Sequence, residues 1–215
     1  MNDIVLIVTS CDKYKSLQEP FFKIFKKYWP DCPFEVRLIL LNSGNWAREI
    51  KEALEKIEAP YFFRMSDDSL LSEKVDTEKI LELFEIVKKE NICFLGLSLF
   101  PRYDIDFPQF KNYPDLIEIN NDPYRVNLRP GIWNKEVFVK ILKDGETMWE
   151  MEIEGTKRSG EFKPFVVVKK PVLNFIESSA DGKITKEAVE HLKKEGFDFS
   201  SDTVFAKFSK YPHRV

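Results

Sequence analysis

The stretch YFFRMSDDSLL (61–71) places a run of bulky apolar residues directly before two acidic ones. Residues 61–65 are dense in aromatic side chains, which is typical of a strand buried in a sheet. The polar segment SDDS (66–69) then interrupts the run. Because ligands of open α/β sheets bind outside the carboxyl ends of the strands, this junction is where a binding site is expected.

Apolar patterns on both sides of this stretch alternate between strand and helix. Short Val/Ile-rich runs predict strands, and apolar residues at spacings of three and four predict amphipathic helices between them. The expected strands cover 3–10, 36–42, 61–65 and 92–100, and the first two are expected to be buried. The expected helices cover approximately 17–28, 46–57 and 80–87. This rhythm predicts an α/β fold with a mainly parallel central sheet flanked by helices.

The second half of the chain is less regular. Residues 101–125 are rich in Pro, Tyr, Asp and Asn, which predicts a long irregular connection. Beyond it we expect strands near 124–128, 165–168 and 172–176, and helices near 135–142 and 185–194. No repeat or linker divides the sequence, so we expect a single domain over 1–215.

Composition excludes several classes of protein. The 215 residues carry 33 Lys and Arg against 36 Asp and Glu, a net charge of −3, which argues against general nucleic-acid binding. Cys11, Cys32 and Cys93 lie far apart and predict reduced thiols rather than a disulfide framework or a zinc site. No apolar run approaches the roughly 20 residues of a membrane helix, and the first run is too short for a signal peptide. We therefore expect a cytoplasmic protein with no transmembrane segment.

Acidic residues follow two of the expected strands. Asp12 comes after the first strand, and Asp67 and Asp68 come after the third. Carboxylate oxygens are suited to Mg²⁺ or Mn²⁺, and such ions usually bind phosphate oxygens as well. The alternative is structural, because Asp and Ser are also common turn residues.

A second acidic group surrounds Trp149, at Glu146, Glu150, Glu152 and Glu154. A carboxylate beside a Trp ring is partly desolvated, which raises its pKa and suits it to general-base catalysis. The alternative is a solvated acidic helix face with Trp149 packed in the core.

The two histidines are weaker candidates for site residues than the acidic groups. His191 lies in a Lys-rich helix and is expected to face solvent, whereas His213 lies in the tail, where it has the chemistry to close over a diphosphate and its metal. A disordered end is the alternative for the tail. The chain has neither a P-loop nor a GxGxxG segment, so those nucleotide-binding classes are unsupported.

Three stretches together resemble nucleotide-sugar glycosyltransferases of the GT-A fold, especially the small bacterial proteins encoded in capsular and surface polysaccharide loci. The first is IVTSCDKY (7–14) followed by LQEPFFKIFKKYWPDCPFEVRL (17–38). The second is NWAREIKEALEKIEAPYFFRMSDDSLL (45–71). The third is LRPGIWNKEVFVKILKDGETMWEMEIEGTKR (128–158). The resemblance implies a nucleotide-binding half over 1–100 and an acceptor and catalytic half, with the C-terminal tail, over 101–215.

The resemblance also implies roles for individual residues. The nucleotide is expected to bind at Thr9, Ser10, Asp12 and Asp67. The metal, Mn²⁺ or Mg²⁺, is expected to bind Asp67 and Asp68, with His213 as a further ligand. The catalytic base is expected to be Glu150 or Glu152, and the phosphates are expected to contact Arg129, Lys157 and Arg158. The turn Pro130–Trp133 corresponds to the segment that flanks donor sugar and acceptor. Ser66 stands where a strict DxD motif has its first Asp.

The function that the resemblance implies is metal-assisted transfer of a sugar from a nucleotide-diphosphate donor to a surface-glycan acceptor, a glycan or lipid-linked glycan. Such a protein would be cytoplasmic or peripheral to the inner face of the membrane. The alternative is a catalytically weak or inactive GT-A-like module that binds a nucleotide or glycan. A nucleotidyltransferase is less favoured, because TSCDKYKS (9–16) lacks the glycines of a triphosphate-binding loop.

Overall fold

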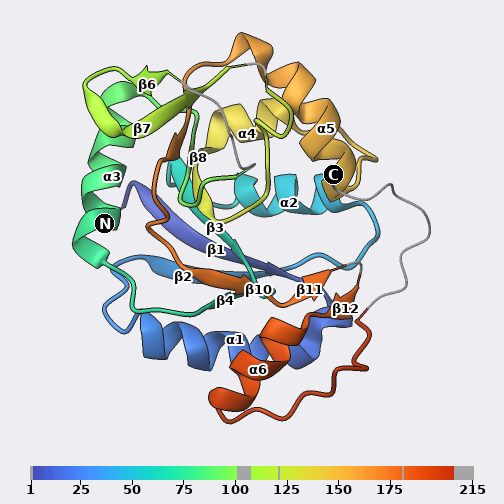
Figure 1. The fold of residues 1–215 in the computed structure, drawn as a ribbon. Helices are drawn as coiled ribbons and strands as arrows, with labels where there is room; N and C mark the ends of the chain where they lie inside the picture. Colours follow the sequence, from blue (N-terminus) through green and yellow to red (C-terminus); the bar gives the residue numbers. More distant parts are fainter. Residues whose placement is uncertain (1, 101–107, 121, 181, 206–215) are drawn as a thin grey trace.

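The computed structural model describes residues 2–100, 108–120, 122–180 and 182–205. Within these ranges an eight-stranded sheet is covered by helices on both faces (Figure 1). The helices are α1 (Lys15–Tyr28), α2 (Trp46–Glu55), α3 (Thr77–Glu90), α4 (Lys135–Ile141), α5 (Met148–Arg158) and α6 (Lys186–Lys194). The sheet, in spatial order, contains β2 (Glu35–Leu40), β1 (Ile4–Ser10), β3 (Tyr61–Ser66), β8 (Gly131–Asn134), β5 (Phe94–Gly96), β9 (Phe165–Val168), β7 (Tyr113–Ile119) and β6 (Gln109–Phe110).

The sheet is mainly parallel, as the sequence predicts. Strand β1 pairs in parallel with β2 and β3, and β5 pairs in parallel with β9. Strands β8 and β7 run the other way, β8 between β3 and β5 and β7 beside β9. Strands from the two halves of the chain therefore alternate within one sheet.

Two small sheets lie beside the main one. Strand β4 (Ser69–Leu71) pairs with β10 (Phe175–Glu177), and β11 (Ser179–Ala180) pairs with β12 (Lys183–Ile184). The β4–β10 pair brings a late segment of the chain against the residues that follow β3. This contact matters for the site described below.

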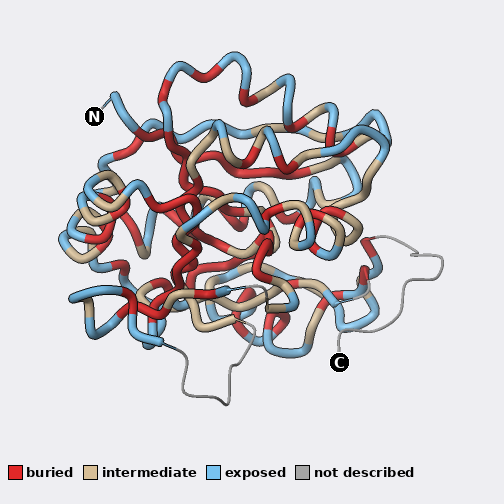
Figure 2. The backbone as a smooth tube through the Cα atoms, turned by 90° about the horizontal axis from the view of Figure 1, so that it is seen from above, coloured by how far each residue is buried: buried red, intermediate tan, exposed pale blue. Residues whose placement is uncertain are grey.

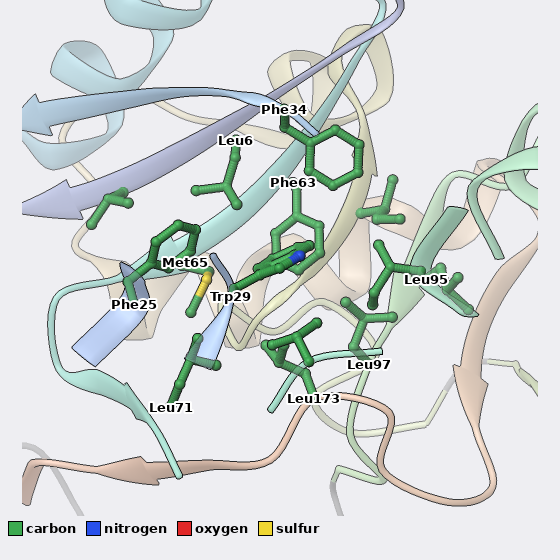
Figure 3. Close-up of a cluster of buried hydrophobic side chains, with 14 of the residues drawn as sticks. Leu6, Phe25, Trp29, Phe34, Phe63, Met65, Leu71, Leu95, Leu97 and Leu173 are labelled. Atoms are coloured by element: carbon green, nitrogen blue, oxygen red, sulfur yellow. The ribbon is translucent and has the colours of Figure 1, made fainter. Parts of the chain in front are cut away.

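The core has two layers, one on each face of the sheet. Apolar residues of α1, α3 and α6 cover one face, and those of α2, α4 and α5 cover the other. Buried backbone runs through the centre of the molecule between exposed helices (Figure 2). Aromatic rings fill much of the first layer: the Trp29 ring lies 5.6 Å from the rings of both Phe25 and Phe63 (Figure 3).

Most helices begin where the sequence supplies a capping side chain. In five of them a side-chain oxygen accepts a hydrogen bond from the backbone N–H three residues later. Such caps satisfy N–H groups that have no partner inside the helix. The capping residues are Asn45, Asp76, Asn134, Thr147 and Thr185.

Strand β2 differs from its prediction. The apolar run at 36–42 was expected to be buried, yet β2 forms the edge of the sheet, and Val36, Leu38 and Leu40 are 36%, 39% and 49% exposed. Periodicity identifies a strand but not its neighbours, so the position at the edge could not be foreseen.

The second half also departs from its predicted pattern. The expected irregular segment contains the antiparallel pair β6–β7, and its residues 101–107 lie outside the described residues. The expected strand near 124–128 is instead a turn. There the N–H groups of Val126 and Leu128 donate to side-chain oxygens of α5, from Thr156 and Glu152. The N–H groups of these two residues are thus satisfied without strand pairing.

Candidate functional site

The carboxyl ends of β1 and β3 meet through a polar cluster. The Ser10 hydroxyl donates to the Asp67 carboxylate and accepts a hydrogen bond from Gln18 Nε2 at 2.8 Å. The Asp67 N–H donates to the Thr9 carbonyl at 3.1 Å, continuing the pairing of the two strands. The structure therefore brings together three of the predicted nucleotide-site residues, Thr9, Ser10 and Asp67.

Asp67 is held in an environment that disfavours its ionisation. Its side chain is 3% exposed. Burial raises the pKa of Asp67 to about 7; the neighbouring charge of Asp68 acts in the same direction, and the Ser10 hydrogen bond opposes them. A cation bound here would relieve this penalty, because it stabilises the charged form.

Asp68 is fixed from two directions. Its carboxylate accepts a hydrogen bond from the Ser66 hydroxyl, and its backbone carbonyl accepts one from the Ser178 N–H at 2.7 Å. Ser178 directly follows β10, whose Glu177 lies opposite Ser69 of β4. The acidic loop, residues 66–69, is thus packed between β1 and the C-terminal segment.

Two adjacent carboxylates fit a divalent cation that takes its remaining ligands from phosphate and water. Mg²⁺ is usually bound this way, through one or two carboxylates plus substrate phosphates. Among the described residues no group of three or more His, Cys, Asp or Glu side chains forms a complete protein cage. His213, the third expected ligand, lies outside the described residues.

Arg64 is a site residue that sequence reasoning missed. It lies on β3 two residues before the acidic loop, is 3% exposed, and donates from Nη2 to the Thr9 hydroxyl oxygen at 3.2 Å. Burial lowers the pKa of Arg64 to about 10, against the opposing charges of Asp68, Glu152 and Asp67. The side chain is therefore still charged at neutral pH, and its position inside an apolar run was the available signal.

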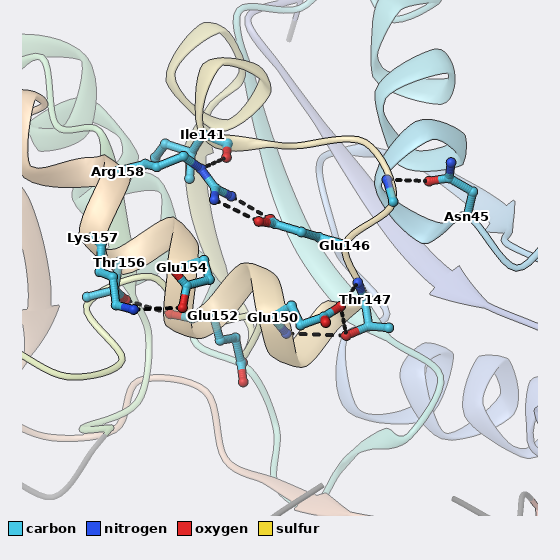
Figure 4. Close-up of polar contacts among 11 residues, drawn as sticks. Asn45, Ile141, Glu146, Thr147, Glu150, Glu152, Glu154, Thr156, Lys157 and Arg158 are labelled. Carbon is cyan, nitrogen blue, oxygen red and sulfur yellow. Dashed lines mark hydrogen bonds and ion pairs between the residues drawn. The ribbon is translucent and has the colours of Figure 1, made fainter. Parts of the chain in front are cut away.

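The two candidate bases have different surroundings (Figure 4). Glu150 completes a capping box: its carboxylate accepts hydrogen bonds from Thr147 N and Oγ1, at 2.8 and 2.9 Å. Glu152 is 4% exposed, accepts a hydrogen bond from the Leu128 N–H at 2.9 Å, and acts electrostatically on Arg64. Glu152 is therefore the candidate that the structure connects to the residues around the acidic loop.

The predicted phosphate contacts are separated by the structure. Arg129 donates from Nε and Nη2 to Glu177, at 3.0 and 2.6 Å, beside the acidic loop. Lys157 pairs with Glu154 on the exposed side of α5. Arg158 forms a two-bond pair with Glu146 and donates to the Ile141 carbonyl, and Glu152 points away from this pair (Figure 4). Arg129 is thus the one of the three next to the acidic loop.

Asp12 lies just beyond β1, in the short helical turn Asp12–Tyr14, and its side chain is exposed. Its backbone N–H donates to the Asn42 side-chain oxygen at 2.8 Å. Asn42 follows β2 in the sequence, and its own N–H donates to Glu49 of α2. The carboxyl ends of β1 and β2 are therefore joined by polar contacts that the sequence did not single out.

Two further features lie away from the acidic loop. His191 was expected to face solvent, but it is 7% exposed and its Nε2 lies 2.9 Å from the Leu71 carbonyl oxygen. Although the sequence around His191 is rich in Lys, one face of α6 is buried, and His191 lies on that face. A surface hollow of about 350 Å³ lies where α1 ends and α3 begins, near Asp31 and Thr77. It is not formed by the predicted site residues.

This architecture is GT-A-like: a large, mainly parallel sheet flanked by helices, with the acidic loop after β3. Among solved structures, residues 1–349 of TarS from S. aureus match 82% of this chain with a TM-score of 0.52 and 12% identity. The complexes of that protein with UDP-GlcNAc and with UDP match 93% of the chain, with TM-scores of 0.51 and 0.50 and identities of 11% and 12%.

The similarity is limited to the fold and to part of the longer protein. This chain spans 60% of the length of the TarS structure in the first of these matches, and 68% and 67% in the two complexes. No protein-family model and no curated protein sequence matches it. None of the helices in the described ranges is long and apolar enough to cross a membrane.

Proposed function

We propose that this protein is a glycosyltransferase that transfers a sugar from a nucleotide-diphosphate donor to a glycan or lipid-linked glycan acceptor. The observation that carries the proposal is the joining of Ser10 and Asp67 at the carboxyl ends of β1 and β3. Ligands of such sheets bind at this edge. The GT-A-like fold, shared with a protein whose structures hold UDP-GlcNAc and UDP, supports the same assignment.

Each group of residues has a role in the proposed reaction. Thr9, Ser10 and Asp12 bind the nucleoside, and Asp67 and Asp68 hold Mn²⁺ or Mg²⁺ against the diphosphate. The divalent ion would stabilise the negative charge that develops on the leaving diphosphate. Arg129, next to the acidic loop, is placed to add positive charge on the same side.

Glu152 is our preferred general base. A base must take the proton from the acceptor hydroxyl as that oxygen bonds to the anomeric carbon. Glu152 lies on α5, whereas the metal ligands follow β3, so the two acidic groups come from different elements. Glu150 is occupied in the capping box at the start of α5.

The second candidate function is a GT-A-like module that binds a nucleotide or glycan without turnover. One observation favours it: Ser66 occupies the first position of the acidic motif, and its hydroxyl donates to Asp68 instead of providing a further carboxylate. Such a module would bind UDP or a sugar but leave the donor intact.

Thermal unfolding with UDP, GDP and their sugar conjugates, each with and without Mn²⁺, tests the proposal. A ligand at 100 times its dissociation constant stabilises the folded state by about 2.7 kcal/mol, a shift of about 5–10 °C for a chain of this size. We expect one nucleotide to give a shift that depends on Mn²⁺. Flat curves across the panel would contradict the transferase and would leave the second function only as a glycan-binding module.

Two variants separate the transferase from the binding module. Asp68→Asn should abolish release of UDP from the donor if the reaction needs the metal, whereas a module without metal should keep its affinity for the nucleotide. Glu136→Gln, on the exposed side of α4, is the matched control and should leave both measurements unchanged.

A further inference from the structure

Arg64 is a buried cation with two unused donor atoms. Among the described residues its hydrogen bond goes to the Thr9 hydroxyl oxygen. Its Nε and Nη1 have no hydrogen-bond partner in the part of the chain that the structure describes. Buried polar groups are normally paired, because leaving them unpaired destabilises the fold. An exception at the edge of a proposed ligand site calls for a functional reason.

Three carboxylates lie near enough to act on this charge: those of Asp68, Glu152 and Asp67. No hydrogen bond joins any of them to the guanidinium within the described ranges. When all three are ionised, they and the guanidinium together carry two negative charges. A divalent cation would offset this excess of negative charge.

The Phe94 ring covers the two positions of the sheet beside Arg64. Arg64 lies level with Gly131 of β8, and Gly131 lies level with Gly96 of β5, so the next two positions across the sheet carry no side chain. At Gly131 a Cβ atom would lie 2.6 Å from the Phe94 ring and 2.7 Å from the Leu95 carbonyl oxygen. These contacts exclude larger residues beside Arg64.

Arg64 also lies between two elements that come from different halves of the chain. The acidic loop follows its own strand, and Glu152 comes from α5. Glu152 in turn holds the Leu128 N–H, one residue before Arg129, and Arg129 pairs with Glu177 beside the acidic loop. These hydrogen bonds connect α5 and β10 near the acidic loop, and the Arg64 charge acts on the carboxylates of both Glu152 and that loop.

We propose that Arg64 is a positioning residue for the diphosphate end of the donor site. Its buried charge holds the carboxylates of the acidic loop and of Glu152 in the arrangement that accepts a metal-bound diphosphate. This inference rests on the proposed function. It adds a residue to which neither the acidic motif nor the resemblance assigns a role.

Binding of UDP and of uridine, each measured by calorimetry with MnCl₂, separates positioning from a general structural role. Arg64→Met removes the charge and should weaken UDP binding about tenfold or more, while uridine binding changes less than about twofold. Arg64→Lys keeps the charge and should bind UDP within about threefold of the wild type. Loss of a charge-assisted interaction has an effect of this size.

Arg125→Met is the matched control. Arg125 is also fully buried, but it donates to the carbonyls of Ser159 and Phe162, away from the acidic loop. We expect this variant to be less stable than the wild type while keeping the wild-type ratio of UDP to uridine affinity. If Arg64→Met does not fold, Arg64→Gln replaces it in the same comparison.

The outcomes distinguish the inference from the function on which it rests. UDP affinity unchanged in the folded neutral variant, or UDP and uridine affinity lowered equally, would overturn the positioning role alone. A wild-type protein that binds none of UDP, GDP and their sugar conjugates would overturn the proposed function, and the role of Arg64 with it.

Discussion

Asp67 carries a carboxyl group in a place where its charge is disfavoured, and stability should therefore depend on pH. Burial raises the pKa of Asp67 from 3.8 to about 7. The folded state therefore holds this proton more tightly than the unfolded state does. The resulting stabilisation is fully present below pH 4 and is lost as the pH rises through 7.

We expect the contribution of Asp67 to the free energy of unfolding to fall, by an amount on the order of a few kcal/mol, between pH 5 and pH 8. Urea unfolding in metal-free buffer at several pH values measures it. Asp67→Asn should flatten this part of the profile, because the amide does not titrate. Identical pH profiles for variant and wild type would show that Asp67 titrates normally.

Glu150 and Glu152 allow a second test on single residues. Gln can replace Glu in a capping box, so Glu150→Gln should keep both stability and transferase activity. Glu152→Gln should lower kcat by about 10²- to 10⁴-fold if Glu152 is the base. Transfer from the nucleotide-sugar that stabilises the wild-type protein in thermal unfolding is the measurement, and the reverse pattern would assign the base to Glu150.

The sequence predicted which acidic residues are candidates for the site but not which role each of them has. Glu150 and Glu152 are separated by one residue, and both fit the chemistry of a general base. Only the position of Thr147, three residues before Glu150, hinted at a capping box. That Glu152 lies near enough to act on the charge of Arg64 depends on how α5 packs on the sheet, which local spacing does not specify.

At the scale of elements, the neighbouring strands β1 and β2 carry similar apolar side chains but differ in burial. Leu6 and Val36 lie opposite each other in adjacent strands, yet β1 is central and β2 is at the edge. Leu6 is fully buried, whereas Leu38 is 39% exposed. The same kind of side chain therefore contributes very differently to stability in the two strands.

We expect Leu6→Ala to lower the free energy of unfolding by about 2–5 kcal/mol through loss of buried surface and formation of a cavity. Leu38→Ala should cost about 1 kcal/mol or less, because much of its side chain already contacts water. Denaturant unfolding of the two variants gives the comparison. Similar losses for both would show that β2 is covered in solution.

The ends of helices could be predicted from the sequence better than which elements lie next to each other. Capping side chains and apolar spacing act within a few residues, so the helices α1, α4 and α6 were expected close to their observed bounds. The turn at 124–128 was not expected, because two of its N–H groups, those of Val126 and Leu128, are satisfied by α5 side chains 30 and 24 residues away.

At the scale of the molecule, the two halves of the chain build one sheet. In the described part of the chain, β5 pairs with β8 and β9, both from the second half, and β8 also separates β5 from β3. A protein assembled this way should unfold as one unit.

We expect the full-length protein to show a single cooperative thermal transition by circular dichroism. The fragment 1–100 should show none, because β3 would lose β8, β5 would lose both β8 and β9, and Phe94 would lose its packing against Trp133 and Phe165. A cooperative transition in the fragment would indicate two independent domains.

The sequence by itself determined the class of fold, the strands β1, β3 and β9, and the position of the acidic loop, since each depends on patterns a few residues long. Tertiary structure decided that β2 lies at the edge, that His191 is buried, and that Glu152 and Arg64 lie on the same side of the sheet. These features arise from contacts between residues far apart in the chain. The pattern of side chains predicts the type of a local element, but not which elements pack against it, and that packing decides how much of each residue is buried.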